Sequence, residues 1–346
     1  MLIALAACRH DHDHDAPASA PVADARLAVE VDPRIELFSV LQRLAGFPEY
    51  TRAATPYARA ADAWFASVAD DPAVAAFRQL RTERGISFDA ALTLAVQLDP
   101  DLRPSQPLSP LPEGVDPRWQ GVDVEALLAQ VRAFRAASRF DDFRASQATY
   151  AHAVEDRLRA FVAARQLLPW FDAAFGARAG ASYHAAPGLL TGAMSYGVHA
   201  GPLVIIEVMD LETPDADGLP TFGPVTEALL AHELAHSYVN PIVHAHLAEV
   251  SGAWPMFDAA APAMARQHYM TREIVVDESL VRAVTVLYLR DKVSAAAADA
   301  SLAEQQRLGF TWTPALATAL ETARASHGGV WGDGEMIVTT AAVLAR

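Results

Sequence analysis

The spacing of hydrophobic positions indicates a largely helical chain with a short β region in its second half. Apolar residues recur at helical spacing through most of the first half and again beyond residue 224. A β-branched run at residues 203–209 interrupts this pattern and is the best candidate for a strand, and residues 193–197 are a candidate for an earlier strand or its turn. The pattern therefore predicts a predominantly α-helical α+β fold with a small sheet before the helix that begins near residue 225.

The predicted elements fall into two regions, residues 34–180 and 181–346, which form either one compact unit or two. Residues 99–121 are rich in proline and are expected to form an ordered crossing of the surface, in preference to a domain linker. Residues 336–340 are a candidate for a further strand. Helices are expected at residues 35–45, 57–69, 73–84, 88–98, 122–138, 140–166, 225–239, 255–270, 271–290, 295–308 and 314–326.

An HExxH motif, His232 to His236, lies in the helix expected at residues 225–239, and the dipeptide Asn240-Pro241 favours a helix end just after it. Four residues make about one helical turn, so both histidines lie on one face and can bind one Zn²⁺ ion. Glu233 lies roughly 100° further around the helix, where a general base belongs. Two histidines and a glutamate are costly to bury among leucines unless they have partners, and a metal ion supplies them. The alternative is a buried helix whose histidines bond to backbone.

A zinc site needs a third protein ligand, and Glu278 is the best candidate. The metzincin extension HExxHxxGxxH is absent, because Val239 replaces its glycine and Ile242 replaces its histidine. Hydrophobic residues at helical spacing surround Glu278, so its carboxylate projects from an apolar face, where an unpaired charge is expensive.

Two alternatives for the third ligand remain open. Glu273 and Asp277 are four residues apart and resemble the ExxxD motif of some gluzincins, which implies Glu273 as the ligand and Asp277 as the hydrogen-bond partner of a ligand histidine. His244 and His246 form an HxH pair soon after the motif, and either one is the other alternative.

The order of these residues resembles that of the gluzincins, in which the HExxH helix is followed by a helix with a ligand glutamate. The segment Asp277-Glu278-Ser279 fits several of their branches, but 41 residues separate His236 from Glu278, a longer interval than in thermolysin-like enzymes. The resemblance implies a zincin-like catalytic region at residues 181–346, in which residues 241–270 are inserted. It also implies that the edge strand of the sheet pairs with extended substrate backbone.

The wider string HExxHSxVNP at residues 232–241 and the string E-S-x-V-R-A at residues 278–283 resemble a second, more specific group. This is an uncharacterised bacterial family catalogued only as a domain of unknown function, and the resemblance runs from about Arg34 to the C-terminus. It implies a zinc metallopeptidase that acts on a peptide or protein, and nothing more about the substrate.

In the predicted mechanism, His232, His236 and Glu278 hold one catalytic zinc ion, and Glu233 passes a proton from the activated water to the leaving amine. Asp277 is a candidate to orient a ligand histidine. For each of the five donor residues listed next, the alternative is a purely structural role. Donors that are candidates to stabilise the oxyanion are Tyr196, His199, Tyr238, Tyr269 and Arg282.

Composition narrows the classes of partner. The chain has 346 residues and a net charge of −15, which argues against nucleic-acid binding because that needs a basic surface. No apolar run reaches the roughly 18 residues of a membrane span. The oligomeric state is not predicted by the sequence.

The N-terminus carries the single cysteine. Residues 1–8 end in Leu5-Ala6-Ala7-Cys8, which resembles a bacterial lipobox and predicts a protein of the cell envelope that touches the membrane only through a lipid on Cys8. If the match is accidental, the protein is cytoplasmic. Residues 9–33 are expected to form a disordered tether, whose His/Asp-rich start is also able to collect zinc. A non-catalytic lipoprotein with a structural or vestigial zinc site and a zinc-scavenging lipoprotein are therefore the alternative functions.

Overall fold

The computed structural model describes residues 26–192, 195–201, 204–209, 214–250, 255–267, 269 and 271–345. The predicted lipobox at Cys8 and the His/Asp-rich segment that follows lie outside the described residues. None of the described helices combines the length and apolarity that crossing a membrane requires.

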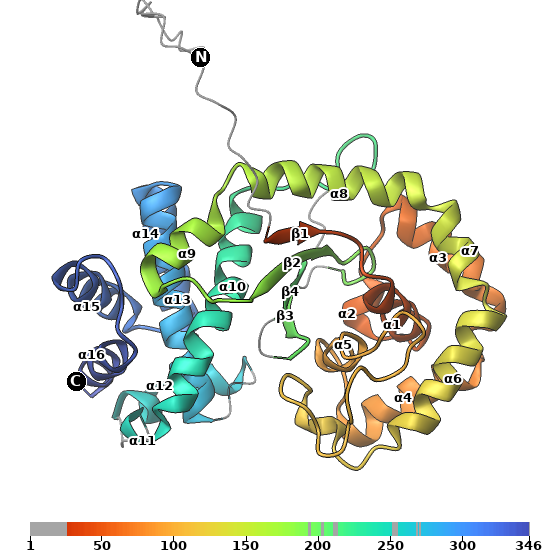
Figure 1. Cartoon of the computed structure of the whole chain (residues 1–346), viewed down its shortest axis with the longest axis horizontal. Coiled ribbons are helices and arrows are strands. Elements are labelled where there is room, and N and C mark those ends of the chain that lie inside the picture. The colour runs from red at the N-terminus through yellow and green to blue at the C-terminus, as the bar shows by residue number, and fades with distance from the viewer. Residues whose placement is uncertain are drawn as a thin grey trace, which may run out of the picture.

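Figure 1 shows a small sheet between two groups of helices, with the long helix α8 (Ala148–Ala163) running from one group to the other. Proline stands in the first turn of α1, α3 and α4, and the preceding Asp32, Thr55 and Asp71 accept hydrogen bonds from backbone N–H groups of those turns. Because these signals are local, the three helices begin within two residues of the positions predicted from the sequence. The first group contains α1 (Pro33–Leu44), α2 (Pro48–Thr51), α3 (Pro56–Phe65), α4 (Pro72–Arg84), α5 (Ala90–Ala95), α6 (Val124–Ala137) and α7 (Phe140–Ser146), with short 3₁₀ helices at Ala66–Val68 and Pro117–Trp119.

The sheet has four strands in the order β1-β2-β4-β3. Strands β1 (Leu27–Val29), β2 (Ser182–Pro187) and β4 (Val204–Met209) are parallel, and β3 (Tyr196–His199) is antiparallel to β4 at the edge of the sheet. The sheet precedes the helix with the HExxH motif, so the predicted fold class, a predominantly helical α+β protein, is confirmed. Strand β1 lies within residues 9–33, so the end of that segment is not a tether.

The sheet separates two hydrophobic cores. Tyr183 and Ala185 of β2 belong to the core of the second helix group, whereas Ala186 of β2 belongs with Tyr196 and Val198 of β3 to the core of the first. Neighbouring strand residues point to opposite faces, and this alternation lets one short strand serve both cores. Along α8 the buried residues change from the first core to the second, and between Ala186 and Val198 the described buried hydrophobic residues belong to the first core again.

The second helix group holds the motif. Its central pair, α10 (Pro224–Ala245) and α13 (Arg272–Lys292), packs side by side (Figure 1). Both helices are lined with buried aliphatic side chains, so tertiary packing fixes how they face each other. The other members are α9 (Leu167–Phe175), α11 (Leu247–Val250), α12 (Pro255–Ala265), α14 (Ala295–Leu308), α15 (Thr313–Ser326) and α16 (Asp333–Leu344).

The predicted end of the motif helix at Asn240-Pro241 is wrong, because α10 continues through Pro241 to Ala245. Proline cannot donate the hydrogen bond that the carbonyl oxygen of Ser237 would ordinarily accept. In this fold Arg178 donates to that oxygen instead, and Ile242 and Val243 are buried in the core. The interior proline is therefore tolerated.

Three other sequence-based predictions differ from the structure. Residues 336–340 lie in helix α16 and not in a strand, because Met336, Ile337 and Thr340 are buried at helical spacing. The helix expected at residues 140–166 is broken at Gln147, where α7 ends and α8 begins. The helix expected at residues 88–98 is reduced to α5, because Phe88 adopts a left-handed backbone conformation with a φ of 55°.

The buried carboxyl of Glu36 in α1 gives a prediction about stability. The side chain is 0% exposed, and one of its oxygens accepts a hydrogen bond of 3.0 Å from the backbone N–H of Leu189. Burial raises the pKa of Glu36 to about 7. The folded state therefore holds a proton that the unfolded chain has already lost, and the stability contributed by this group falls as the pH rises from about 4.5 to about 7.

We expect Glu36→Gln to remove this pH dependence, because glutamine does not ionise. Between pH 4.5 and 7 the free energy of unfolding of the variant should rise relative to that of the wild type by up to about 3 kcal/mol. Urea unfolding at a series of pH values measures the difference, with Glu125→Gln at an exposed position as the control. Parallel pH profiles for the Glu36 variant and the wild type would contradict the prediction.

Candidate metal centre

Helix α10 places two imidazoles side by side, and α13 brings a carboxylate to them. Leu230, Leu234 and Tyr238 are buried in the core on one side of α10, which leaves His232 and His236 on the side that faces α13. Helix α13 begins after Thr271, whose hydroxyl accepts a hydrogen bond from a backbone N–H of the first turn. Glu278 follows in its second turn.

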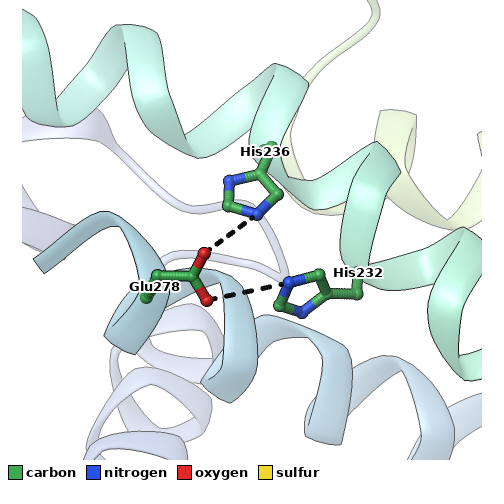
Figure 2. Close-up of side chains that lie close together, drawn as sticks. All are labelled: His232, His236 and Glu278. Carbon is green, nitrogen blue, oxygen red and sulfur yellow. Dashed lines mark ion pairs between the residues drawn. The ribbon is translucent and has the colours of Figure 1, made fainter. Parts of the chain in front are cut away.

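The three side chains point toward one another (Figure 2). The Nε2 atom of His232 lies 3.8 Å from one oxygen of Glu278, and Nε2 of His236 lies 3.6 Å from the other. Within the described part of the chain, His232, His236 and Glu278 are the one group of three or more potential ligands whose ligand atoms lie close enough, within 4.8 Å, to share a metal ion. Two histidines and a glutamate are a ligand set typical of catalytic zinc.

The surroundings keep His232 in the form that binds metals. Burial lowers the pKa of His232 well below its ordinary value, and the nearby His236 and Arg282 lower it further. The imidazole is therefore neutral at physiological pH. A neutral imidazole offers a nitrogen lone pair without first releasing a proton.

Arg282, one turn after Glu278, forms an ion pair of 2.9 Å with one oxygen of that carboxylate. Its guanidinium also donates to the side chains of Gln305 and Tyr269, so it is held from three directions. Only 9% of Arg282 is exposed. This arrangement fixes the orientation of the Glu278 carboxylate and gives Arg282 a structural role.

Asn240, and not the candidate Asp277, makes a hydrogen-bonding contact with a proposed ligand histidine. The Oδ1 atom of Asn240 lies 3.1 Å from Nδ1 of His236, one turn away on the same helix. A hydrogen bond at Nδ1 leaves Nε2 free to face Glu278. Asn240 lies four residues after His236, but the helix was expected to end at Asn240-Pro241, so the sequence did not predict this contact between successive helical turns.

We expect Asn240→Ala to weaken zinc binding by roughly 10- to 100-fold, because the imidazole of His236 loses the contact that fixes its orientation. Asn240→Asp keeps an acceptor at the same place and should bind zinc at least as well as the wild type. Competition with a zinc-sensitive dye measures both affinities. Equal affinities for the alanine variant and the wild type would show that Asn240 has no such role.

Glu233 lies beside the three ligands and contacts the edge of the sheet. Its carboxylate accepts a hydrogen bond from the backbone N–H of Gly197 in β3. Burial raises the pKa of Glu233 to about 7, and the negative charges of Glu278 and Asp89 add to the rise. A carboxyl group with a pKa near neutrality can both accept and release a proton at physiological pH.

The alternative ligands lie away from the three converging side chains. The exposed Glu273 and His244 approach each other to 3.4 Å, with 42% and 79% of their side chains exposed. His246 approaches Glu249 at the same distance. Among these alternatives, the described geometry brings none to His232 and His236.

The other candidate residues have different surroundings. Tyr238 points into the aromatic core, where its hydroxyl lies 2.9 Å from that of Tyr183. Tyr196 is buried in the core of the first helix group. His199, at the end of β3, interacts electrostatically with His236, and burial lowers its pKa to about 4. Tyr269 accepts a hydrogen bond of 3.1 Å from Arg282.

Asp277 is partly buried next to these groups, and its Oδ1 atom has no hydrogen-bond partner. Burial raises its pKa to about 7, and the charge of the nearby His236 opposes the rise. Asp277 therefore contributes to the electrostatic environment of His236 without bonding to it.

Comparison with known proteins identifies one region of the chain. Residues 215–327 match a family described as a domain of unknown function, DUF4932. This segment includes the HExxH motif and Glu278, so the resemblance to a domain of unknown function is confirmed over it, although it spans less than half of the chain. No curated protein and no solved structure matches the chain.

Proposed function

We propose that the protein is a zinc-dependent metallopeptidase that hydrolyses peptide bonds, with Glu233 as its general base. The observation that carries the proposal is the convergence of His232, His236 and Glu278 beside Glu233. Glu233 is not a member of the ligand group, and it is held separately by the backbone of β3. This division of roles, with three ligands and a neighbouring carboxylate, is what the HExxH mechanism needs.

The residues fit a zinc ion in both charge and number. The ligand set of two imidazoles and one carboxylate is of the kind that zinc prefers. Three protein ligands leave a coordination position for water or substrate, whereas structural zinc sites are normally closed by four protein ligands. The described residues offer three, which favours a catalytic site over a structural one.

Different residues of the chain have different roles in the proposed hydrolysis. When bound by the three ligands, zinc supplies a Lewis acid that polarises the substrate carbonyl and lowers the pKa of water. Glu233 accepts the proton of the attacking water and delivers it to the amine that leaves. Asn240 and Arg282 hold His236 and Glu278 in place. We assign the extended substrate backbone to β3, the edge strand of the described sheet, which contacts Glu233 through Gly197.

The test of this proposal is cleavage of an unfolded protein by zinc-loaded protein, with its metal-depleted form as the comparison. Cleavage that disappears on chelation and returns with zinc supports it. If the zinc-loaded protein cleaves no peptide in a diverse library and chelation causes unfolding, the zinc site is structural and the proposal is wrong.

A further inference from the structure

A cavity of about 470 Å³ opens directly beside the proposed catalytic residues. His232 and Glu233 form part of its wall, together with the first turns of α10 and parts of α13 and α14. Its volume lies within the range that is usual for small-ligand pockets. A group bound in this cavity therefore lies next to the atoms that would carry out the reaction.

The walls of the cavity are largely apolar. The apolar part is formed by Val225, Ala228 and Leu229 of α10, Leu289 of α13, and Ala297 and Ala300 of α14. Polar groups of Thr285, Ser301 and Gln305 also line the cavity. The small side chains of α14 leave the space open, because a larger residue at their positions would extend into it. Burial of apolar substrate surface against these walls is favourable by roughly 25 cal/mol per Å².

Apart from Glu233, the proposed general base, the charged groups at the cavity form ion pairs within the protein. Arg282 forms its ion pair with Glu278, and Glu304 is bound by Arg307 through two hydrogen bonds, of 2.5 and 2.8 Å. An acidic side chain that entered the cavity would lose its hydration without gaining a free counter-charge there. The cavity therefore disfavours acidic side chains, and the remaining carboxylate that a basic side chain could pair with there is that of Glu233, which the proposed reaction needs.

We propose that this cavity selects the substrate by receiving a bulky, uncharged apolar side chain, such as leucine or phenylalanine, from the residue next to the bond that is cleaved. The inference rests on the proposed peptidase function, because it assigns a substrate preference to the same site. Helix α14 is then a determinant of specificity, although it carries none of the proposed metal ligands or the proposed general base.

The first measurement is the cleavage preference of the zinc-loaded protein on a diverse peptide library, determined by mass spectrometry of the products. We expect leucine and phenylalanine to exceed aspartate and lysine at one position flanking the cleaved bond by at least about tenfold in kcat/KM. An absence of preference at both flanking positions, or a preference for charged residues, would overturn the proposal.

The second measurement assigns the preference to the cavity. Ala300→Phe adds an aromatic ring on the cavity side of α14, and it should abolish the preference, so that phenylalanine and glycine peptides are cleaved at similar rates. Ala296→Phe adds the same ring at an exposed position of the same helix that does not line the cavity, and it should preserve the preference. A preference that persists in the Ala300 variant places the selecting pocket elsewhere.

A third measurement separates this proposal from the proposed function. Zinc-loaded Glu233→Gln protein is titrated by calorimetry with blocked peptides that differ in one residue, phenylalanine or aspartate. Tighter binding of the phenylalanine peptide, lost on addition of Ala300→Phe, supports the pocket even if no cleavage is ever detected. Equal binding of both peptides, or no binding of either, rejects the pocket whether or not the protein is a peptidase.

Discussion

Glu233→Gln should leave zinc binding intact and reduce peptide hydrolysis by roughly 10²- to 10⁴-fold. Glutamine has nearly the same shape as glutamate and preserves the carbonyl oxygen that can accept the hydrogen bond from Gly197. It has no ionisable group, so it cannot accept a proton from water. Because Glu233 lies outside the ligand group, the metal should remain bound. The two readouts are zinc content by mass spectrometry and the rate of cleavage of an unfolded protein.

The burial of Glu233 determines what the variant does to stability. The cost of burying the carboxylate raises its pKa to about 7, so its replacement by a neutral amide should not destabilise the fold near neutral pH. A loss of activity can then be attributed to the chemistry and not to unfolding. Glu249→Gln, an exposed change in the same matched domain, is the control and should retain wild-type activity. Unchanged hydrolysis by the Glu233 variant would exclude Glu233 as the base.

The sequence was sufficient for the part of the site that lies on one helix. The positions of His232 and Glu233 relative to His236 depend only on helical geometry, and the surrounding leucines and alanines favour that helix strongly. Glu278 was also predicted correctly as a neighbour of the two histidines, although 41 residues intervene. The reason is that a carboxylate on an apolar helical face requires a partner, and two histidines alone leave a zinc site one protein ligand short.

The sequence was insufficient where the outcome depends on contacts between distant segments. Strands β1 and β2 are short, and β1 pairs with β2, which lies more than 150 residues further along the chain, so these strands carry little local signal. The contact between Asn240 and His236 depends on α10 continuing through Pro241, which Arg178 makes possible from outside the helix. Tyr238 follows the motif closely, and only the fold shows that it faces the core.

A second variant tests Glu278, the proposed third zinc ligand. Glu278→Ala should weaken zinc binding by at least roughly 100-fold, because one of three ligands is lost. It should also destabilise the protein by about 3 to 5 kcal/mol, because it leaves the guanidinium of Arg282 buried without its carboxylate. Zinc affinity and the free energy of unfolding of the metal-depleted protein are therefore both measured.

The double variant Glu278→Ala/Arg282→Met distinguishes a lost ligand from a damaged fold. Removal of the buried cation as well should restore a large part of the lost stability, because no uncompensated charge remains. Zinc binding should stay weak, since the missing ligand is not replaced. If zinc affinity recovered together with stability, Glu278 would act only through the fold.

The matched test of the alternative ligand is Glu273→Ala, which should bind zinc as the wild type does, because that side chain is partly exposed and directed to His244. If the Glu273 variant lost zinc and the Glu278 variant retained it, Glu273 and not Glu278 would be the third zinc ligand.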